Sequence, residues 1–189
     1  YITEKYRLVY PSKVDTNIKD LTENVAILLQ GPIELKNNFT IETIKLYLRN
    51  FPNAKIVLST WESEKENCIE LERLGIDIIY GQMIHREYGF GSTNLQIQSN
   101  KNGLKHIKKI GKRYTLKTRT DQRYCNPYLL SFLLNMQSLF PLASSNFKQK
   151  ERIVGMSFDT FAFRLYSLSD MFLFGDTDDI YDYWNCSFD

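Results

Sequence analysis

Charged side chains alternate at residues 119 to 123, where Arg119, Asp121 and Arg123 follow the strand-like run YTLKT. A carboxylate at such a strand end is a hard oxygen ligand that can share Mg²⁺ or Mn²⁺ with the phosphates of a nucleotide. Guanidinium groups bind phosphate oxygens directly. The structural alternative is that Asp121 caps the following helix while both arginines pair with surface acids. Spacing alone leaves both interpretations open.

A second acidic group, Asp176 and Asp178 in the segment GDTDD, forms a literal DxD pattern. This pattern often holds a metal ion in sugar transferases. The group directly precedes IYDYW, an apolar-periodic helix start, where acids cap exposed amides and complement the helix dipole. The position therefore favours helix capping over metal binding.

Several common catalytic patterns are absent from the sequence. No GxGxxG, GxxxxGK[ST] or GxSxG motif is present, which removes the main support for dinucleotide binding, P-loop phosphate binding and a serine nucleophile elbow. His85 and His106 lie outside any metal or triad spacing. We expect His106 on a helix face and keep His85, in a glycine-containing stretch, as a candidate substrate contact.

Four apolar, strand-like runs alternate with four helical patterns along the chain. The predicted strands span 24–33, 54–63, 76–82 and 113–121, and the predicted helices span 39–52, 66–75, 95–112 and 127–137. Thr40 is a candidate N-cap of the first helix. Further strands are expected within 151–158 and 163–175, and a last helix begins near residue 178. The alternation predicts a parallel sheet with helices on both faces.

Composition favours one globular domain at 24–189, preceded by an N-terminal arm at 1–23. The formal net charge of +2 is too small to indicate a nucleic-acid partner. No apolar run reaches about 18 residues, so we expect at most peripheral membrane contact. Three widely spaced cysteines favour the reducing cytoplasm over a disulfide framework. The chain ends without a clear terminating signal, so we expect truncation at its C-terminus.

Ligands of open α/β sheets bind outside the carboxyl ends of the strands. The residues in that position are polar, contain glycine and carry both charges. A nucleotide with a diphosphate and a sugar needs such surroundings. The four predicted strand ends supply Gln30, Gly31 and Pro32; Ser59, Thr60, Trp61 and Glu62; Gly81 and Gln82; and residues 119 to 123.

Five segments carry a resemblance to a known family, in this chain order: ILLQGPI, TIETIKLYLRNFPNAKIVLSTWE, NLQIQS, YTLKTRTDQR and LSDMFLFG. They resemble the motifs of the WavE lipopolysaccharide-synthesis family of bacterial sugar transferases. The resemblance covers residues 24 to 184. It implies a GT-A-like, Rossmann-type sandwich with a mostly parallel central sheet flanked by helices. It also implies a nucleotide-diphosphate sugar donor and a divalent cation, Mn²⁺ or Mg²⁺.

The resemblance also implies roles for individual residues, by position. Asp121 takes the place of the metal-binding DxD motif, here reduced to TRTD with threonine in place of its first acid, so Arg119 or Arg123 could carry part of the diphosphate charge. Asp170 takes the place of the base that deprotonates the acceptor, with a turn or cap as its structural alternative. Gln30, Gly31 and Pro32 border the nucleotide, Thr60 and Glu62 its base or ribose, and Asn94, Gln96 and Ser99 the diphosphate and donor sugar.

The sequence thus predicts a glycosyltransferase that moves a sugar to a hydroxyl of a lipopolysaccharide or capsule-type glycan, or a lipid-linked saccharide. We expect it in the cytoplasm, or at the inner face of the membrane. Two alternatives stay open: a sugar nucleotidyltransferase, for which QGPIELKNN supplies a poor phosphate loop, and a non-catalytic nucleotide- or glycan-binding module. Candidates for stacking on a base or sugar ring are Trp61, Tyr88, Phe90 and Trp184.

Overall fold

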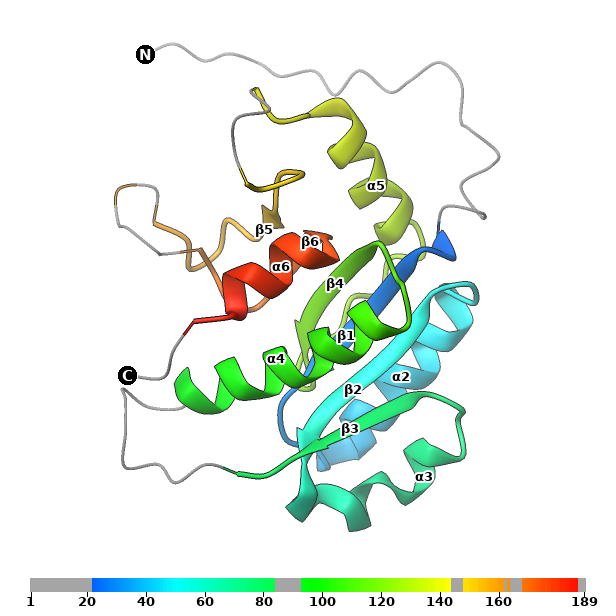
Figure 1. The fold of residues 1–189 in the computed structure, drawn as a ribbon. Coiled ribbons are helices and arrows are strands. Elements are labelled where there is room, and N and C mark those ends of the chain that lie inside the picture. The colour runs from blue at the N-terminus through cyan, green and yellow to red at the C-terminus, as the bar shows by residue number, and fades with distance from the viewer. Residues whose placement is uncertain (1–21, 84–92, 144–147, 162, 164–167, 187–189) are drawn as a thin grey trace.

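The computed structural model describes residues 22–83, 93–143, 148–161, 163 and 168–186, which form a mixed α/β fold around one sheet (Figure 1). The sheet has six strands in the order β3-β2-β1-β4-β6-β5. The strands are β1 Val25–Gln30, β2 Lys55–Trp61, β3 Asp77–Gly81, β4 Tyr114–Arg119, β5 Val154–Gly155 and β6 Leu173–Asp176. The α-helices are α2 Phe39–Asn50, α3 Ile69–Glu72, α4 Thr93–Lys109, α5 Leu129–Leu139 and α6 Thr177–Trp184.

Strand order reverses beside β1. From β1 the chain moves outward to β2 and β3 on one side, and β4 then returns to the other side of β1. These four strands are parallel, as the sequence predicts, whereas β6 and β5 join antiparallel. The junction of β1 and β4 is therefore the topological switch point, where sheets of this kind bind ligands.

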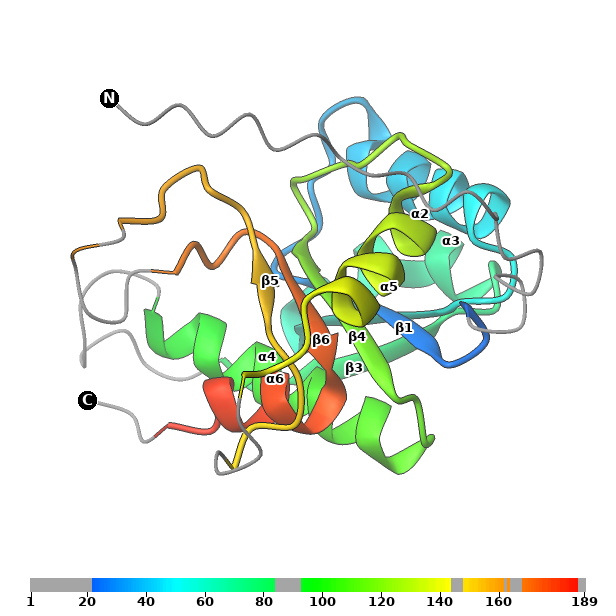
Figure 2. The same ribbon diagram turned by 90° about the horizontal axis from the view of Figure 1, so that it is seen from above.

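Helices cover both faces of the sheet because β1 is apolar on both sides. Val25, Ile27 and Leu29 pack with α2, α3 and α5, whereas Ala26 and Leu28 pack with α4 and α6. Seen from above, these two groups of helices lie on opposite sides of the sheet (Figure 2). The prediction of a two-faced, mostly parallel sheet is confirmed. No helix of the described residues has the length and apolar character needed to cross a bilayer.

Two predictions about helices in the first half of the chain are wrong. The helix predicted at 66–75 is mainly a 3-10 helix, Glu62–Cys68, and only one α-helical turn follows it in α3. Its polar stretch ESEKEN buries no residue before Cys68, so little apolar surface holds a regular helix there. Thr40 is not the N-cap of α2, because it lies inside the helix, and its hydroxyl donates to the Thr120 carbonyl at 3.0 Å.

The predicted strands near the C-terminus are shorter than expected. The segment 151–158 contributes only the two residues of β5, and the described part of 163–175 contributes β6 from Leu173 onward. β6 lies against β4 with Leu173 opposite Lys117. This antiparallel strand brings the turn that carries Asp170 next to the middle of β4.

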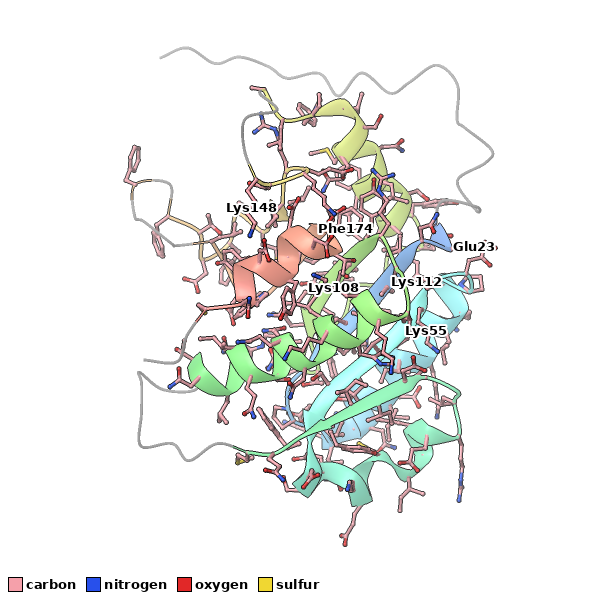
Figure 3. The ribbon with its side chains drawn as sticks, viewed as in Figure 1. Glu23, Lys55, Lys108, Lys112, Lys148 and Phe174 are labelled. Atoms are coloured by element: carbon pink, nitrogen blue, oxygen red, sulfur yellow. The ribbon has the colours of Figure 1, made fainter. Side chains whose placement is uncertain are left out.

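The literal DxD pattern is a helix cap, as its position indicates. Asp176 accepts a hydrogen bond from the Asp178 N–H at 2.9 Å and so caps α6. Asp178 pairs with Lys108 of α4 at 2.7 Å, and Asp179 accepts from the main-chain amides of Lys150 and Glu151. The side-chain view shows Lys108 beside α6 (Figure 3). These acids join α6 to α4 and to the segment before β5.

A glycine at the switch point lets the ends of β1 and β4 approach each other. Gly31 has a φ of +127°, and a Cβ atom added to it would lie 2.9 Å from the hydroxyl oxygen of Thr120. Its N–H donates to the Ser59 carbonyl, and the Thr120 N–H donates to the Gln30 carbonyl, each at 3.1 Å. Only glycine combines this backbone conformation with this contact.

Replacing Gly31 by alanine is therefore expected to destabilise the fold more than the same change at an open position. Gly111→Ala is the matched control, since Gly111 also has a positive φ of +74° but nothing within 4 Å of the place that a Cβ atom would take. The positive φ costs about 1–3 kcal/mol in both variants. The larger φ of Gly31 and the contact with Thr120 should together add at least about 1 kcal/mol, or about 2–4 °C in melting temperature, to Gly31→Ala alone. Equal losses in thermal denaturation would contradict this account.

Candidate functional site

A pocket of about 480 Å³ opens at the switch point, between the carboxyl ends of β1 and β4. Its volume lies in the range typical of sites for small ligands and cofactors. It brings together the predicted residues Gln30, Gly31, Pro32, Gln96, Arg119 and Asp121. Trp61 and Thr120, which the predicted strand ends include, also line it. The lining residues that the sequence analysis did not name are Ile33, Glu34, Glu64, Met83 and Leu95.

The lining is apolar in some positions and charged in others. Trp61, Met83 and Leu95, from the ends of β2 and β3 and the first turn of α4, contribute apolar surface. Polar groups come from the two glutamines, the acids and Arg119. A ligand with one flat apolar part and one strongly polar part, such as a nucleotide, matches this distribution.

Arg119 and Asp121 form a two-pronged ion pair on the pocket wall. The Arg119 Nε and Nη2 atoms donate to the two carboxylate oxygens of Asp121 at 2.9 Å and 2.6 Å. This pairing lowers the pKa of Asp121 and raises the pKa of Arg119. Arg119 is the one cationic side chain among the described lining residues. The same guanidinium geometry fits two oxygens of a phosphate group.

The arrangement around Asp121 does not fit a resident divalent cation. Both of its oxygens already accept hydrogen bonds from Arg119, and the residue two positions before it is that arginine instead of a second acid. Among the residues that the structure describes, no three His, Cys, Asp or Glu side chains gather as a metal-binding group. Dependence on Mn²⁺ or Mg²⁺ therefore stays a prediction from the family resemblance.

Other predicted residues lie outside the pocket lining. Thr60 is buried, and so are Asn94 and Ser99. Ser99 joins α4 to β2, since its hydroxyl donates to the Ser59 carbonyl at 3.1 Å and its own carbonyl accepts from the Ser59 hydroxyl at 2.7 Å. Glu62 opens the 3-10 helix outside the lining, whereas Glu64 reaches the pocket.

Arg123 is engaged with helix α2. It donates to the Thr43 hydroxyl at 2.8 Å and to the Phe39 carbonyl at 2.9 Å, and its guanidinium lies over the Phe39 ring. These contacts hold the first turn of α2 against the segment after β4. The two arginines that the sequence treats as equivalent thus have different partners, and only Arg119 lines the pocket.

Asp170 lies outside the pocket lining, but its negative charge affects the pKa of two cationic side chains of β4. Its negative charge contributes to the raised pKa of Arg119, after the larger effect of Asp121. It also opposes the lowering of the pKa of Lys117. Acids on two segments, the end of β4 and the turn before β6, therefore act on the same arginine.

Lys117 is a buried cation that the sequence-based site prediction missed. Its side chain is 0 % exposed, its ammonium donates to the main-chain carbonyl of Asp170, and its Nζ lies 4.9 Å from the centre of the Trp184 ring. Burial lowers its pKa to about 8. A lysine in the middle of a strand whose neighbouring positions, Leu116 and Thr118, are predicted to be buried is the sequence signal that could have revealed it.

The remaining candidates divide by position. Trp61 lines the pocket, whereas Trp184 is buried beside Lys117. His106 lies on α4 as predicted, and its Nε2 contacts Asp77 at 2.8 Å. The other three candidates, His85, Tyr88 and Phe90, fall outside the described residues. Nearly all of the predicted N-terminal arm also falls outside them.

Comparisons with known proteins agree with the fold and the motifs. The family model for WavE lipopolysaccharide synthesis matches residues 25–188. None of the curated proteins searched matches this chain. Among solved structures, the chain is similar to 4-diphosphocytidyl-2C-methyl-D-erythritol synthase from Anaerococcus prevotii DSM 20548, with a TM-score of 0.51 and 15% identity over 85% of this chain and 74% of that one. This likeness supports the Rossmann-type fold.

Replacing Lys117 by methionine removes the buried charge and keeps most of the side-chain volume. The pKa of Lys117 falls from 10.5 to about 8 on folding, so the unfolded chain binds this proton more tightly than the folded chain. The destabilising effect of the charge is therefore fully present below about pH 8 and disappears as the pH rises towards 10.5. We expect Lys117→Met to melt at a higher temperature than the wild type at about pH 7, with a smaller difference at about pH 9.5.

Lys55→Met is the matched control for this measurement. Lys55 also lies on a strand, but its ammonium pairs with the Asp77 carboxylate at 2.6 Å, so its removal should not raise the melting temperature at either pH. Thermal denaturation at constant ionic strength compares the three proteins. A lower melting temperature for Lys117→Met at about pH 7 would show that the charge supports the fold.

Proposed function

The chain belongs to the WavE lipopolysaccharide synthesis family, and on that premise we propose that it is a glycosyltransferase. It moves a sugar from a nucleotide-diphosphate donor to a hydroxyl of a cell-surface glycan or a lipid-linked saccharide. The observation that carries the proposal is the pocket at the β1–β4 switch point with Arg119 on its wall. A cytoplasmic location, with at most peripheral contact with the inner face of the membrane, belongs to the same proposal.

The donor's diphosphate binds at Arg119. The guanidinium already holds two carboxylate oxygens of Asp121 in a planar, two-pronged contact, and a phosphate group presents its oxygens in the same way. The first turn of α4 lies beside the pocket through Leu95 and Gln96, and it contains no acidic residue. The positive end of the α4 dipole adds to the attraction for an anion.

The nucleoside occupies the apolar part of the pocket. Trp61, Met83 and Leu95 supply the surface for the base, while the amides of Gln30 and Gln96 can donate to ribose or base oxygens. This assignment leaves the sugar on the β4 side, near Arg119. That side also faces the turn that carries Asp170, whose charge acts on Arg119.

Asp170 acts as the general base of a direct displacement. Its carboxylate accepts the proton of the acceptor hydroxyl, and the freed oxygen attacks the anomeric carbon of the donor sugar. The bond from that carbon to the diphosphate oxygen breaks, and the electron pair leaves with the diphosphate. Arg119 stabilises the negative charge that develops on this leaving group.

A sugar nucleotidyltransferase is the second candidate. The similar solved structure is named as a synthase of a diphosphocytidyl compound, so a fold of this kind accommodates the making of a nucleotide-linked product. Such an enzyme brings a nucleoside triphosphate and a phosphorylated acceptor together, which places much negative charge in one pocket. Against this candidate, Arg119 is the one cationic side chain of the described lining, beside Glu34, Glu64 and Asp121.

A thermal-shift screen tests donor binding. The ligands are UDP, GDP, CDP, UDP-glucose, UDP-galactose, GDP-mannose and CDP-glucose, each with and without Mn²⁺. We expect one nucleotide class to raise the melting temperature of the wild type, and Arg119→Gln to reduce its affinity at least about tenfold by removing a charged hydrogen bond. No shift with any nucleotide would remove the donor site from the proposal.

Arg113→Gln is the control for this screen. Arg113 precedes the other end of β4 and also pairs with an acid, Glu151, at 2.7 Å, so it matches Arg119 in chemistry but not in place. It should keep wild-type affinity. The Mn²⁺ arm of the screen, with Asp121→Asn, tests the cation dependence that the family resemblance predicts and the Arg119–Asp121 pair argues against. A shift that needs Mn²⁺ and vanishes in Asp121→Asn would assign Asp121 to the metal.

A product-release assay on the wild type and on Asp170→Asn separates the two enzyme candidates from a binding module. We expect this variant to bind the donor as the wild type does, because Asp170 lies outside the pocket lining, and to lose about 10²-fold or more in sugar transfer or donor hydrolysis. The measurement is the release of nucleoside diphosphate. Release of pyrophosphate from a nucleoside triphosphate and a sugar phosphate would indicate the nucleotidyltransferase instead. Wild-type binding without turnover would indicate a non-catalytic module.

A further inference from the structure

The middle of β4 carries a positive charge that the pocket does not use. Lys117 is 0 % exposed and lies on the face of the sheet that α4 and α6 cover. The ion pairs of the described residues do not include it. Its contacts are the Asp170 carbonyl oxygen and the face of the Trp184 ring, which carry only partial negative charge.

This arrangement costs stability, so the fold does not explain it. Burial disfavours the charged form of Lys117 more than its neighbours favour it, as the lowered pKa of about 8 indicates. An apolar side chain of similar length would fill the same space without that cost. Perturbed, buried charges of this kind gather at functional sites.

The position of Lys117 connects the two acids of the proposed mechanism. Along β4, Lys117 and Arg119 point to the same face, since they are two residues apart on one strand. Arg119 holds Asp121, and Lys117 binds the main chain of Asp170. The turn before β6 is thereby attached to the strand that forms the pocket wall.

We propose that Lys117 is a positioning residue, which fixes the Asp170 turn relative to the diphosphate-binding Arg119. The hydrogen bond from its ammonium to the Asp170 carbonyl sets where the Asp170 carboxylate can lie. Trp184 closes over the ammonium from α6 and keeps it from turning towards water. This inference rests on the proposed function, because it assigns Lys117 a role in placing the base of that reaction.

The first arm of the test needs no substrate. Hydrogen exchange of the amides at residues 168–172 is compared in the wild type, Lys117→Met and Thr115→Val. Thr115 is the matched control, because it lies on the same face of β4, is buried and has its own hydrogen-bond partner, the Thr177 hydroxyl at 2.9 Å. We expect faster exchange at 168–172 in Lys117→Met alone. Unchanged exchange there would overturn the inference, whether or not the protein is a glycosyltransferase.

The second arm measures turnover of the nucleotide sugar that the wild type hydrolyses or transfers in the assay of nucleoside diphosphate release. Lys117→Met should bind that donor within about twofold of the wild type, since Lys117 does not line the pocket, and its single-turnover rate should fall at least about tenfold. Added to Asp170→Asn, the same change should have no further effect, because it acts through Asp170. Thr115→Val should lower stability and leave the rate within about twofold of the wild type.

The outcomes distinguish the inference from the proposed function. An equal loss of rate for Lys117→Met in the wild-type and Asp170→Asn backgrounds would overturn the positioning role, as would a loss of donor binding together with a lower melting temperature. A wild type that turns over no nucleotide sugar would overturn the proposed function and the catalytic part of the inference together. In that case, faster exchange at 168–172 would still establish the structural link between Lys117 and the Asp170 turn.

Discussion

The close approach of β1 and β4 at the switch point is the constraint on which the pocket depends. Gln30 lies opposite Arg119 in the sheet, and the chain beyond each residue is fixed by main-chain hydrogen bonds, from Gly31 to Ser59 and from Thr120 to Gln30. The hydroxyl of Thr40 donates to the Thr120 carbonyl and so adds α2 to the same junction. The backbone of the lining residues 30–31 and 119–120 is thus fixed by the pairing of strands in the sheet and not by loop conformation.

The sequence predicts where the strands end better than it predicts which side chains face the pocket. Apolar runs closed by polar or glycine residues locate Gln30 and Arg119 well, since burial on both faces leaves a clear boundary. Orientation is harder, because successive residues of a strand point to opposite faces. Trp61 lines the pocket while its neighbour Thr60 does not. Glu64 lines the pocket and Glu62 does not, and both belong to a 3-10 helix that directly follows β2, where the sequence predicts the end of a strand.

Long-range contacts decide the roles that the sequence leaves open. Arg119 and Arg123 have equal spacing from Asp121, but the chain turns after β4, and Arg123 meets Phe39 and Thr43 of α2. The contact between Lys117 and Asp170, which are 53 residues apart, cannot be read from the sequence, because it forms only when β6 pairs with β4. Periodicity carries no information on either pairing, since both join segments that are distant in sequence.

The charge balance of the described pocket lining limits how it could hold the diphosphate of the proposed donor. Its described lining has three carboxylates, from Glu34, Glu64 and Asp121, and the guanidinium of Arg119. The general field of the lining therefore repels anions, and the chain's net charge of +2 is too small to compensate. Among the described residues, the directed contacts open to the diphosphate of the proposed donor are the fork of Arg119 and the N-terminal amides of α4. Asp121 occupies the Nε and Nη2 donors of Arg119, so in the proposed binding mode a phosphate either displaces this carboxylate or binds the Nη1 edge. The affinity of the proposed site then depends on the geometry of this one pair more than on the number of charges around it.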